Sequence, residues 1–243
     1  TLNRPEKRNA ISFHLIEELL AAFDEIEQSD DRVLILTGSG KAFCAGMDLE
    51  DLKSLLGKTL DENLRDSERM CRLFRRLYEF PKPTIAAVNG AAIAGGTGLA
   101  TMCDFTLAVP EAKFGYTEVR IGFVPALVSS ILVWQVGHKM ARDLLLTGRL
   151  FDAEEGRRMG LINEIVEPAK LMERARELAA HLLENSPTSL QMTKKLINSF
   201  LARELDRQMG EAVETNAQSR TTADFREGIT SFLEKRKPRW SGK

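Results

Sequence analysis

Cysteine, histidine and aromatic residues are scarce in this chain of 243 residues. It has three cysteines, three histidines and an aromatic fraction of 7%. An odd number of cysteines without paired spacing predicts no disulfide framework and is typical of a reducing compartment, so we expect a cytoplasmic location. No group of residues has the spacing of metal ligands. We therefore expect no metal site.

The chain also lacks an excess of charge of one sign and long apolar runs. Its 34 Lys and Arg residues against 35 Asp and Glu residues give a net charge of −1. A balanced charge does not favour a nucleic acid or an anionic membrane surface as partner. No apolar run is long enough to cross a bilayer, and no phosphate loop ending in Gly-Lys-Ser/Thr occurs. We expect neither a nucleic-acid partner nor a membrane partner.

The spacing of apolar residues divides the chain into two parts. In the first part strands alternate with helices, which implies an α/β core with largely parallel pairing. The expected strands are 33–37, 84–89 and 105–108, and the expected helices are 12–28, 61–80 and 129–146. Asp152 is expected to cap a further helix that Gly160 ends. We assign residues 1–167 to this core.

After about Pro168 only helical patterns occur. A helical tail behind an α/β core often packs on a partner subunit or covers a site. We therefore treat residues 168–243 as a separate helical region. Its expected helices are 168–184, 187–204, 206–218 and 222–235.

Two glycine-containing turns carry the strongest chemical signal. The first lies at 43–49, after the expected strand 33–37, and the second at 90–98, after the apolar run 84–88. A turn from a strand into a helix presents free backbone N–H groups at the positive end of the helix dipole. Such donors can hold a phosphate or the oxyanion of a polarised carbonyl. With the carboxylate of Glu118 downstream, the turns predict a site that stabilises an enolate.

A series of short motifs runs in a fixed order from residue 2 to residue 236. They are Leu2-Asn3-Arg4-Pro5 with Asn9-Ala10, Ala42 to Leu49, Lys82 to Gly90, Met102-Cys103-Asp104, Leu146-Thr147-Gly148, Gly160-Leu161-Ile162 and Phe232 to Arg236. Together they resemble the crotonase family, the enoyl-CoA hydratase/isomerase superfamily. The resemblance covers essentially the whole chain.

The resemblance implies a spiral of β-β-α repeats with a C-terminal helical trimerisation region. Periodicity alone favours a doubly wound sheet instead. The implied substrate is an acyl-CoA thioester, with coenzyme A entering as part of the substrate and no separate cofactor. The implied assembly is a homotrimer or a hexamer built as a dimer of trimers.

The resemblance also implies catalytic roles for three positions. The backbone N–H groups of Met47 and Gly95 would hold the thioester oxygen, and Glu118 would transfer protons. Desolvation in an acyl pocket should raise the pKa of Glu118, which suits proton transfer near neutral pH. The simpler alternatives are that the glycines only allow close helix–strand packing and that Glu118 pairs with Arg120 at the surface.

One position departs from the family pattern. The second catalytic glutamate of the hydratases falls at Gly98, which carries no carboxylate. The chemistry must then run on Glu118 alone or use another polar side chain. The candidates for that second group are Tyr116, Thr97, Ser129, Ser130 and Asp143.

Further positions are implied to bind the substrate. Coenzyme A would contact the backbone of the turn at Ala45, Asp48 and Leu49. Phe232 and Lys235 in the tail are weaker candidates, as are Lys7 and Arg8 for the phosphates. The acyl pocket would be formed by Gly96, Gly98, Tyr116 and Pro125, with Phe123 to Ser129 replacing a glycine-rich segment found in many members.

Three functions remain open at this point. The first is hydration of an α,β-unsaturated acyl-CoA, with Glu118 as the single acid/base. The second is Δ3,Δ2-enoyl-CoA isomerisation, for which one carboxylate is chemically sufficient because no water has to be positioned. The third, from another class, is a non-catalytic acyl-CoA-binding protein. Turnover that depends on Glu118 distinguishes the enzymes from the binding protein.

Overall fold

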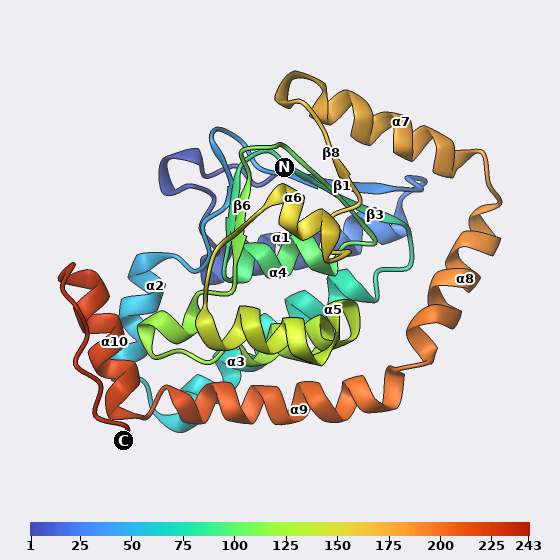
Figure 1. The fold of residues 1–243 in the computed structure, drawn as a ribbon. Helices are drawn as coiled ribbons and strands as arrows, with labels where there is room; N and C mark the ends of the chain where they lie inside the picture. Colours follow the sequence, from blue (N-terminus) through green and yellow to red (C-terminus); the bar gives the residue numbers. More distant parts are fainter.

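Two stacked sheets form the centre of the molecule in the computed structural model, which describes residues 1–243 (Figure 1). All strand pairs are parallel except β6 with β7, which are antiparallel. One sheet has the strand order β1-β3-β5-β8 and the other the order β2-β4-β6-β7. From β1 to β6, strands of one sheet alternate along the chain with strands of the other. This is the expected spiral of β-β-α repeats, and not a doubly wound sheet. The strands are β1 (Leu34–Thr37), β2 (Ala42–Cys44), β3 (Thr84–Val88), β4 (Ala91–Ile93), β5 (Phe105–Ala108), β6 (Lys113–Gly115), β7 (Phe151–Asp152) and β8 (Glu164–Ile165).

Strand β3 is the buried centre of the first sheet. Leu34 of β1 lies opposite Thr84, and Ile85 lies opposite Phe105 of β5, both in parallel register. Every residue of β3 is buried. A continuous apolar run is expected of a parallel strand that is covered on both faces. The expected strands 33–37, 84–89 and 105–108 are confirmed to within one residue.

Two of the helices expected from capping residues begin at those residues. The Ser12 side chain accepts from the backbone N–H of Leu15 at 3.1 Å, and Asp152 caps α6 in the same way. Such a cap replaces a missing intrahelical partner. The helices before the tail are α1 (Phe13–Gln28), α2 (Leu49–Ser54), α3 (Leu60–Tyr78), α4 (Gly95–Met102), α5 (Ala126–Thr147) and α6 (Ala153–Arg158). The short 3₁₀ segments are η1 (Pro5–Lys7), η2 (Leu55–Gly57), η3 (Glu118–Ile121) and η4 (Pro168–Lys170).

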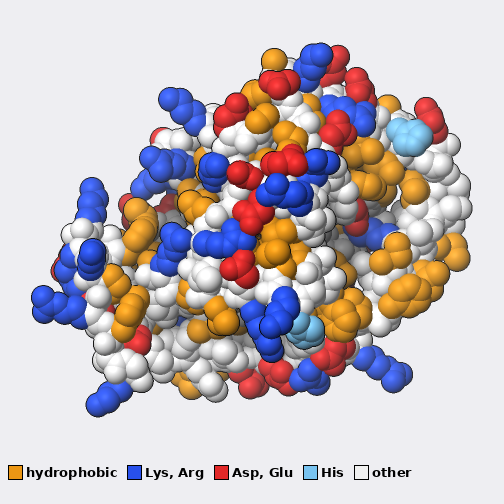
Figure 2. Space-filling model, viewed as in Figure 1, with side chains coloured by type: hydrophobic (Ala, Val, Ile, Leu, Met, Phe, Trp, Pro, Cys, Tyr) orange, Lys and Arg blue, Asp and Glu red, His pale blue; other side chains and the backbone are white.

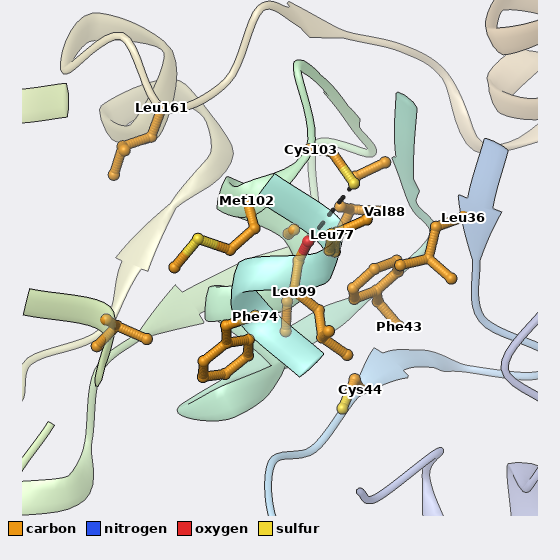
Figure 3. Close-up of a cluster of buried hydrophobic side chains, with 14 of the residues drawn as sticks. Leu36, Phe43, Cys44, Phe74, Leu77, Val88, Leu99, Met102, Cys103 and Leu161 are labelled. Carbon is orange, nitrogen blue, oxygen red and sulfur yellow. Dashed lines mark hydrogen bonds between the residues drawn. The ribbon is translucent and has the colours of Figure 1, made fainter. Parts of the chain in front are cut away.

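The main core lies between α3, α4 and the sheets (Figure 3). Phe74 and Leu77 of α3 point toward Leu99 of α4, and all three are buried. The Sγ of Cys103 lies 3.6 Å from the Leu99 carbonyl oxygen, as the dashed line shows. This packing fixes α4, and therefore the turn that precedes it, against the body of the protein.

The tail helices pack on different parts of the core. They are α7 (Leu171–Leu183), α8 (Pro187–Ser199), α9 (Ala202–Ser219) and α10 (Ala223–Leu233). Helix α7 contacts β3 and β5, α9 lies along α3 and α5, and α10 packs on η3. In Figure 1, α8 stands away from the body at the right. The division at residue 167 stays a prediction.

The expected helix 187–204 is wrong in its extent. The chain leaves the helix at Phe200 and Leu201, and α9 starts at Ala202. No glycine or proline marks this break in the sequence. The direction of α9 is set by its contact with α3 and α5, which a pattern of local spacing does not contain.

Candidate active site

The two glycine-containing turns lie side by side at the ends of neighbouring strands. Strand β2 pairs with β4 in parallel, with Cys44 opposite Ala92. A Cβ added to Gly46 would lie 3.0 Å from the carbonyl oxygen of Ile93. Both turns therefore follow short strands that the sequence patterns did not reveal. They do not directly follow β1 and β3.

Each turn carries a backbone N–H without a partner. Ile11 donates to the Gly46 oxygen at 2.7 Å and accepts from Asp48 at 2.9 Å, and the N–H of Met47 between them makes no hydrogen bond. Gly95 is the first residue of α4, so its N–H has no intrahelical acceptor. Both residues line one cavity. Two adjacent free donors are what an oxyanion requires.

Ala94 holds the second turn in a strained conformation. Its φ of 51° and ψ of −120° lie in a region that residues with a Cβ rarely adopt. Its N–H donates to the Gly115 oxygen at 2.7 Å, which fixes the peptide before the helix. Strain of this kind costs about 1–3 kcal/mol and is concentrated at functional sites. Here it orients the N–H of Gly95.

Glu118 is the first residue of η3, and α10 packs against this segment. A Cβ on Gly122 would lie 2.4 Å from the carbonyl oxygen of Asp224, and one on Gly228 would lie 2.2 Å from that of Ile121. Gly122 also has a φ of 68°, which favours glycine. The two glycines allow direct backbone contact between η3 and α10. The tail therefore positions the segment that carries Glu118.

The Glu118 carboxyl group is buried without a hydrogen-bond partner at Oε2. Burial raises its pKa from 4.5 to about 7, and its own backbone N–H lowers it by a smaller amount. Arg120 is exposed, so the alternative of a surface pair is not what the structure shows. A carboxyl group that titrates near neutral pH can both take and return a proton.

Glu118 shares a mainly apolar cavity with both free donors. The cavity encloses about 1130 Å³ up to and including its open mouth. Its polar side chains are Asp66, Thr117, Glu118, Asn216 and Arg220. The other lining residues include Ile11, Phe13, Ala45, Met47, Leu49, Leu52, Met70, Phe74, Ile93, Ala94, Gly95, Ile121, Phe123, Val124, Pro125, Ala126, Leu127, Val128 and Phe232.

The space beside Gly98 is filled by apolar side chains. A Cβ there would lie 2.9 Å from Val128 Cγ1 and 3.0 Å from Phe74 Cζ. Gly98 is itself buried and does not line the cavity. Phe74 and Val128 therefore form the wall where a second carboxylate would otherwise stand.

None of the expected substitutes for that carboxylate lines the cavity. The Tyr116 hydroxyl lies 3.1 Å from Thr101 Oγ1 in the core. Thr97 donates to the Ala92 oxygen at 2.6 Å, and Asp143 pairs with Arg149 at 2.6 Å. Ser129 and Ser130 donate to carbonyl oxygens within α5. Tyr116 was also expected in the acyl pocket, and the structure places it outside.

The residues expected to bind coenzyme A divide into two groups. Ala45, Leu49 and Phe232 line the cavity, and Leu49 and Phe232 are about half exposed at its mouth. Asp48 is buried, caps α2 and pairs with Arg4 at 2.9 Å, so its side chain has a structural role. The other expected contacts, Lys7, Arg8 and Lys235, are exposed and do not line the cavity.

Two expected pocket residues differ in their placement. Pro125 lines the cavity directly. Gly96 does not: a Cβ there would lie 2.2 Å from the Cys44 carbonyl oxygen. Gly96 therefore allows α4 to approach β2, which is the packing role considered as the alternative.

The sequence patterns missed Asp66, Thr117, Asn216 and Arg220. Asn216 and Arg220 are four residues apart at the C-terminal end of α9, so they share one helix face. That spacing was a usable signal, but nothing local shows that this face meets the cavity. No cluster of three or more His, Cys, Asp or Glu side chains could hold a metal ion. No helix is long and apolar enough to cross a membrane.

Comparison with known proteins decides the family. The family model described as enoyl-CoA hydratase/isomerase matches residues 1–243. The chain belongs to this family. We therefore interpret the spiral fold, the paired N–H groups and the position of Glu118 with reference to the enoyl-CoA hydratase/isomerase family.

Relatives in this family carry both activities in their names. A Thermus thermophilus protein with the provisional name enoyl-CoA hydratase is 49% identical over 98% of this chain and 95% of its own length. The 1,2-epoxyphenylacetyl-CoA isomerase of Escherichia coli is 35% identical over 100% and 94%. A solved enoyl-CoA hydratase/isomerase from Pseudoalteromonas atlantica has a TM-score of 0.87 at 31% identity, covering 98% of this chain and 94% of its own. The family includes both hydratases and isomerases, so the reaction must be argued from the site.

Proposed function

We propose that this protein moves the double bond of an enoyl-CoA thioester between the 3 and the 2 position. The observation that carries the proposal is the apolar wall at Gly98, which leaves Glu118 without a second carboxyl group beside it. Asp66, the other carboxyl group of the cavity, is paired with Lys58. Glu118 has a pKa of about 7, raised by burial. A double-bond shift needs one group that takes a proton at C2 and returns it at C4.

The proposed reaction has two proton transfers. Ionised Glu118 takes a proton from C2 of a 3-enoyl-CoA, and the electron pair moves into the thioester carbonyl to form a dienolate. The N–H groups of Met47 and Gly95 donate to the resulting oxyanion. Glu118 then returns the proton at C4, the carbonyl reforms, and the 2-enoyl-CoA has the same atoms as the substrate. Loss of one such donor typically costs about 100-fold or more in rate.

Hydration demands more of the site than this reaction does. A water has to be held at C3 and deprotonated there, usually by a polar group beside the first acid. Phe74 and Val128 stand where that group would be, and apolar side chains cannot orient a water molecule. This difference favours isomerisation over the hydration expected first from the sequence.

Hydration remains the second candidate because of Thr117. Thr117 lines the cavity next to Glu118, and its side chain does not cap η3. A free hydroxyl there could hold the attacking water. The names of the relatives also include hydratases. In this reaction Glu118 would be the single acid/base.

We also propose that coenzyme A is held at the mouth by Ala45, Leu49 and Phe232. This proposal is supported by the position of the three residues: all of them line the cavity, and two are half exposed. No separate cofactor is needed, because the thioester itself supplies the carbonyl that stabilises the carbanion.

We propose in addition that copies of this chain associate through α8. Figure 2 shows hydrophobic side chains gathered over this helix, at the right of the view. Met192, Leu196, Ile197 and Phe200 are exposed there. Burial of such side chains in a homotrimer or a dimer of trimers would remove them from water. Light scattering after gel filtration measures the assembly.

The deciding experiment compares the unchanged protein with Glu118→Gln in D2O. Each is incubated separately with 3-hexenoyl-CoA and crotonyl-CoA, and the products are analysed by mass spectrometry. We expect the 3-enoyl-CoA to become the 2-enoyl-CoA without gain of water, and the variant to lose this activity. Gain of water by crotonyl-CoA would establish hydration and replace the first proposal. Tight binding of both compounds without turnover would establish the binding protein instead.

A further inference from the structure

A group of buried polar side chains lies where α3 faces α9, along one side of the cavity. Ser67 donates to Asn216 Oδ1 at 3.1 Å, and Nη2 of Arg220 donates to the same atom at 2.6 Å. Asn216 in turn donates to the Val124 carbonyl oxygen at 3.1 Å. Asn216 and Arg220 both line the cavity. Proton transfer at Glu118 makes no use of this group.

Arg220 lacks most of its hydrogen-bond partners. Its side chain is buried at 6% exposure, and neither Nε nor Nη1 has a partner. One face of the guanidinium packs on the Phe123 ring at 5.1 Å from the centroid. A guanidinium can donate five hydrogen bonds, so this one retains unused capacity beside the cavity.

The surrounding charges do not neutralise Arg220. Asp66 also lines the cavity, but its Oδ2 is already paired with Lys58. Asp66 is the only charged group that acts on the pKa of Arg220, so the ionised form of Glu118 does not serve as its counterion. The C-terminal end of α9 contributes only a partial negative charge. One net positive charge is left in this part of the site.

Arg220 keeps that charge despite its burial. Desolvation lowers its pKa, and the charge of Asp66 opposes this effect, giving a pKa of about 10. The guanidinium is therefore still protonated at neutral pH. A buried cation without a counterion is unfavourable. An anion that enters the cavity would restore the missing partner.

The phosphates of coenzyme A are poorly suited to this role. Leu49 and Phe232, which mark the mouth of the cavity, are about half exposed, whereas Arg220 is almost fully buried. A large and strongly hydrated phosphate belongs at the exposed end. The group that reaches Arg220 has to be small and carried inward on an apolar chain.

We infer that Arg220 binds a carboxylate at the far end of the acyl chain, so that the preferred substrates are thioesters of dicarboxylic acids. The inference rests on the proposed function in one respect, that an acyl-CoA occupies the cavity. The planar guanidinium matches a carboxylate in shape and donates charge-assisted hydrogen bonds to it. Nε and Nη1 are closed from solvent without a ligand, so the flexible Arg220 side chain turns toward the carboxylate when it binds.

Saturated thioesters test this subsite without any turnover. Succinyl-, glutaryl- and adipyl-CoA are compared by calorimetry with butyryl-, pentanoyl- and hexanoyl-CoA, and each pair differs only in a terminal carboxylate or methyl group. We expect one chain length at which the dicarboxylic compound binds about 10- to 100-fold more tightly than its partner, the range of a charge-assisted hydrogen bond. The limited reach of one arginine side chain predicts an optimum in the length of the acyl chain.

Variants assign the preference to one side chain. Arg220→Met should remove the difference in affinity between the paired compounds, whereas Arg220→Lys should keep part of that difference because the charge remains. Arg226→Met changes an exposed arginine on α10 and should have no effect. If Arg220→Met does not fold by circular dichroism, the length series on the unchanged protein decides alone.

Two results would overturn the inference, and they are distinguishable. Equal binding of both compounds at every chain length removes the carboxylate subsite and leaves the proposed function intact. Absence of binding by both series removes the acyl-CoA site, and with it the proposed function as well as this inference.

Discussion

Replacing Glu118 with Gln should make the protein more stable at neutral pH, and this gain in stability should disappear as the pH falls toward 4. The carboxyl group is buried with an unpaired Oε2, and burial raises its pKa from 4.5 to about 7. Between these two values the unfolded chain has released the proton while the folded chain still holds it. The free energy of unfolding therefore falls as the pH rises through this range.

The size of the effect follows from that pKa shift. One pKa unit corresponds to about 1.4 kcal/mol, so the ionised carboxylate destabilises the folded protein by about 3 kcal/mol above pH 7. Gln has nearly the same shape but never ionises. We expect the variant to exceed the original by about 3 kcal/mol at pH 8, which is about 6–12 °C in Tm for a chain of this size.

The assay is thermal denaturation of both proteins from pH 4 to pH 8.5 at one protein concentration. The difference in Tm should be smallest near pH 4, where both side chains are neutral, and should reach a plateau above about pH 7. Glu111→Gln is the matched control, because Glu111 is exposed, and its difference should stay near zero at every pH. A flat difference for Glu118→Gln, or a less stable variant at pH 8, would refute the reasoning.

Three further outcomes are expected. The kcat/KM for a 3-enoyl-CoA should rise through about pH 7 to a plateau, because Glu118 must start ionised; a pH-independent profile from 5.5 to 8.5 would contradict this. Gly96→Ala should lower the free energy of unfolding by about 3 kcal/mol, since its Cβ would lie 2.2 Å from the Cys44 carbonyl oxygen; an unchanged Tm argues against that contact. Tyr116→Phe should cost about 1 kcal/mol through the lost bond to Thr101, with kcat unaffected, and a large fall in kcat would return Tyr116 to the site.

Local sequence signals predicted the parts of the fold that depend on local chemistry. Ser12 and Asp152 cap helices as expected because capping involves residues three positions apart. The spiral fold was predicted by the motifs that carry the family resemblance. Periodicity alone would have predicted a doubly wound sheet. Strands of three residues such as β2 and β4 escaped detection, because so short a run shows no period.

The residues of the candidate site could likewise be predicted only where they lie in local motifs. Met47, Gly95 and Glu118 follow from motifs in two turns and a loop, and the structure gathers them around one cavity. Arg220 does not follow from a motif, because its position beside the cavity depends on how α9 packs against α3 and α5. Tyr116 was misplaced for a related reason. Residues two positions apart on an extended segment would share one face. The chain turns into η3 at Glu118, so Tyr116 enters the core whereas Glu118 reaches the cavity.

The support that α10 gives to η3 affects when the protein becomes active during synthesis. A chain is made from its N-terminus, and its early parts begin to fold first. The turns that carry the Met47 and Gly95 N–H groups leave the ribosome long before α10 does. Until α10 has docked, nothing holds the η3 segment that carries Glu118 in place. A nascent chain, or a chain cut between α9 and α10, should therefore have the oxyanion donors but no correctly placed base. The appearance of enzymatic activity would therefore show that α10 has been made and has docked on η3.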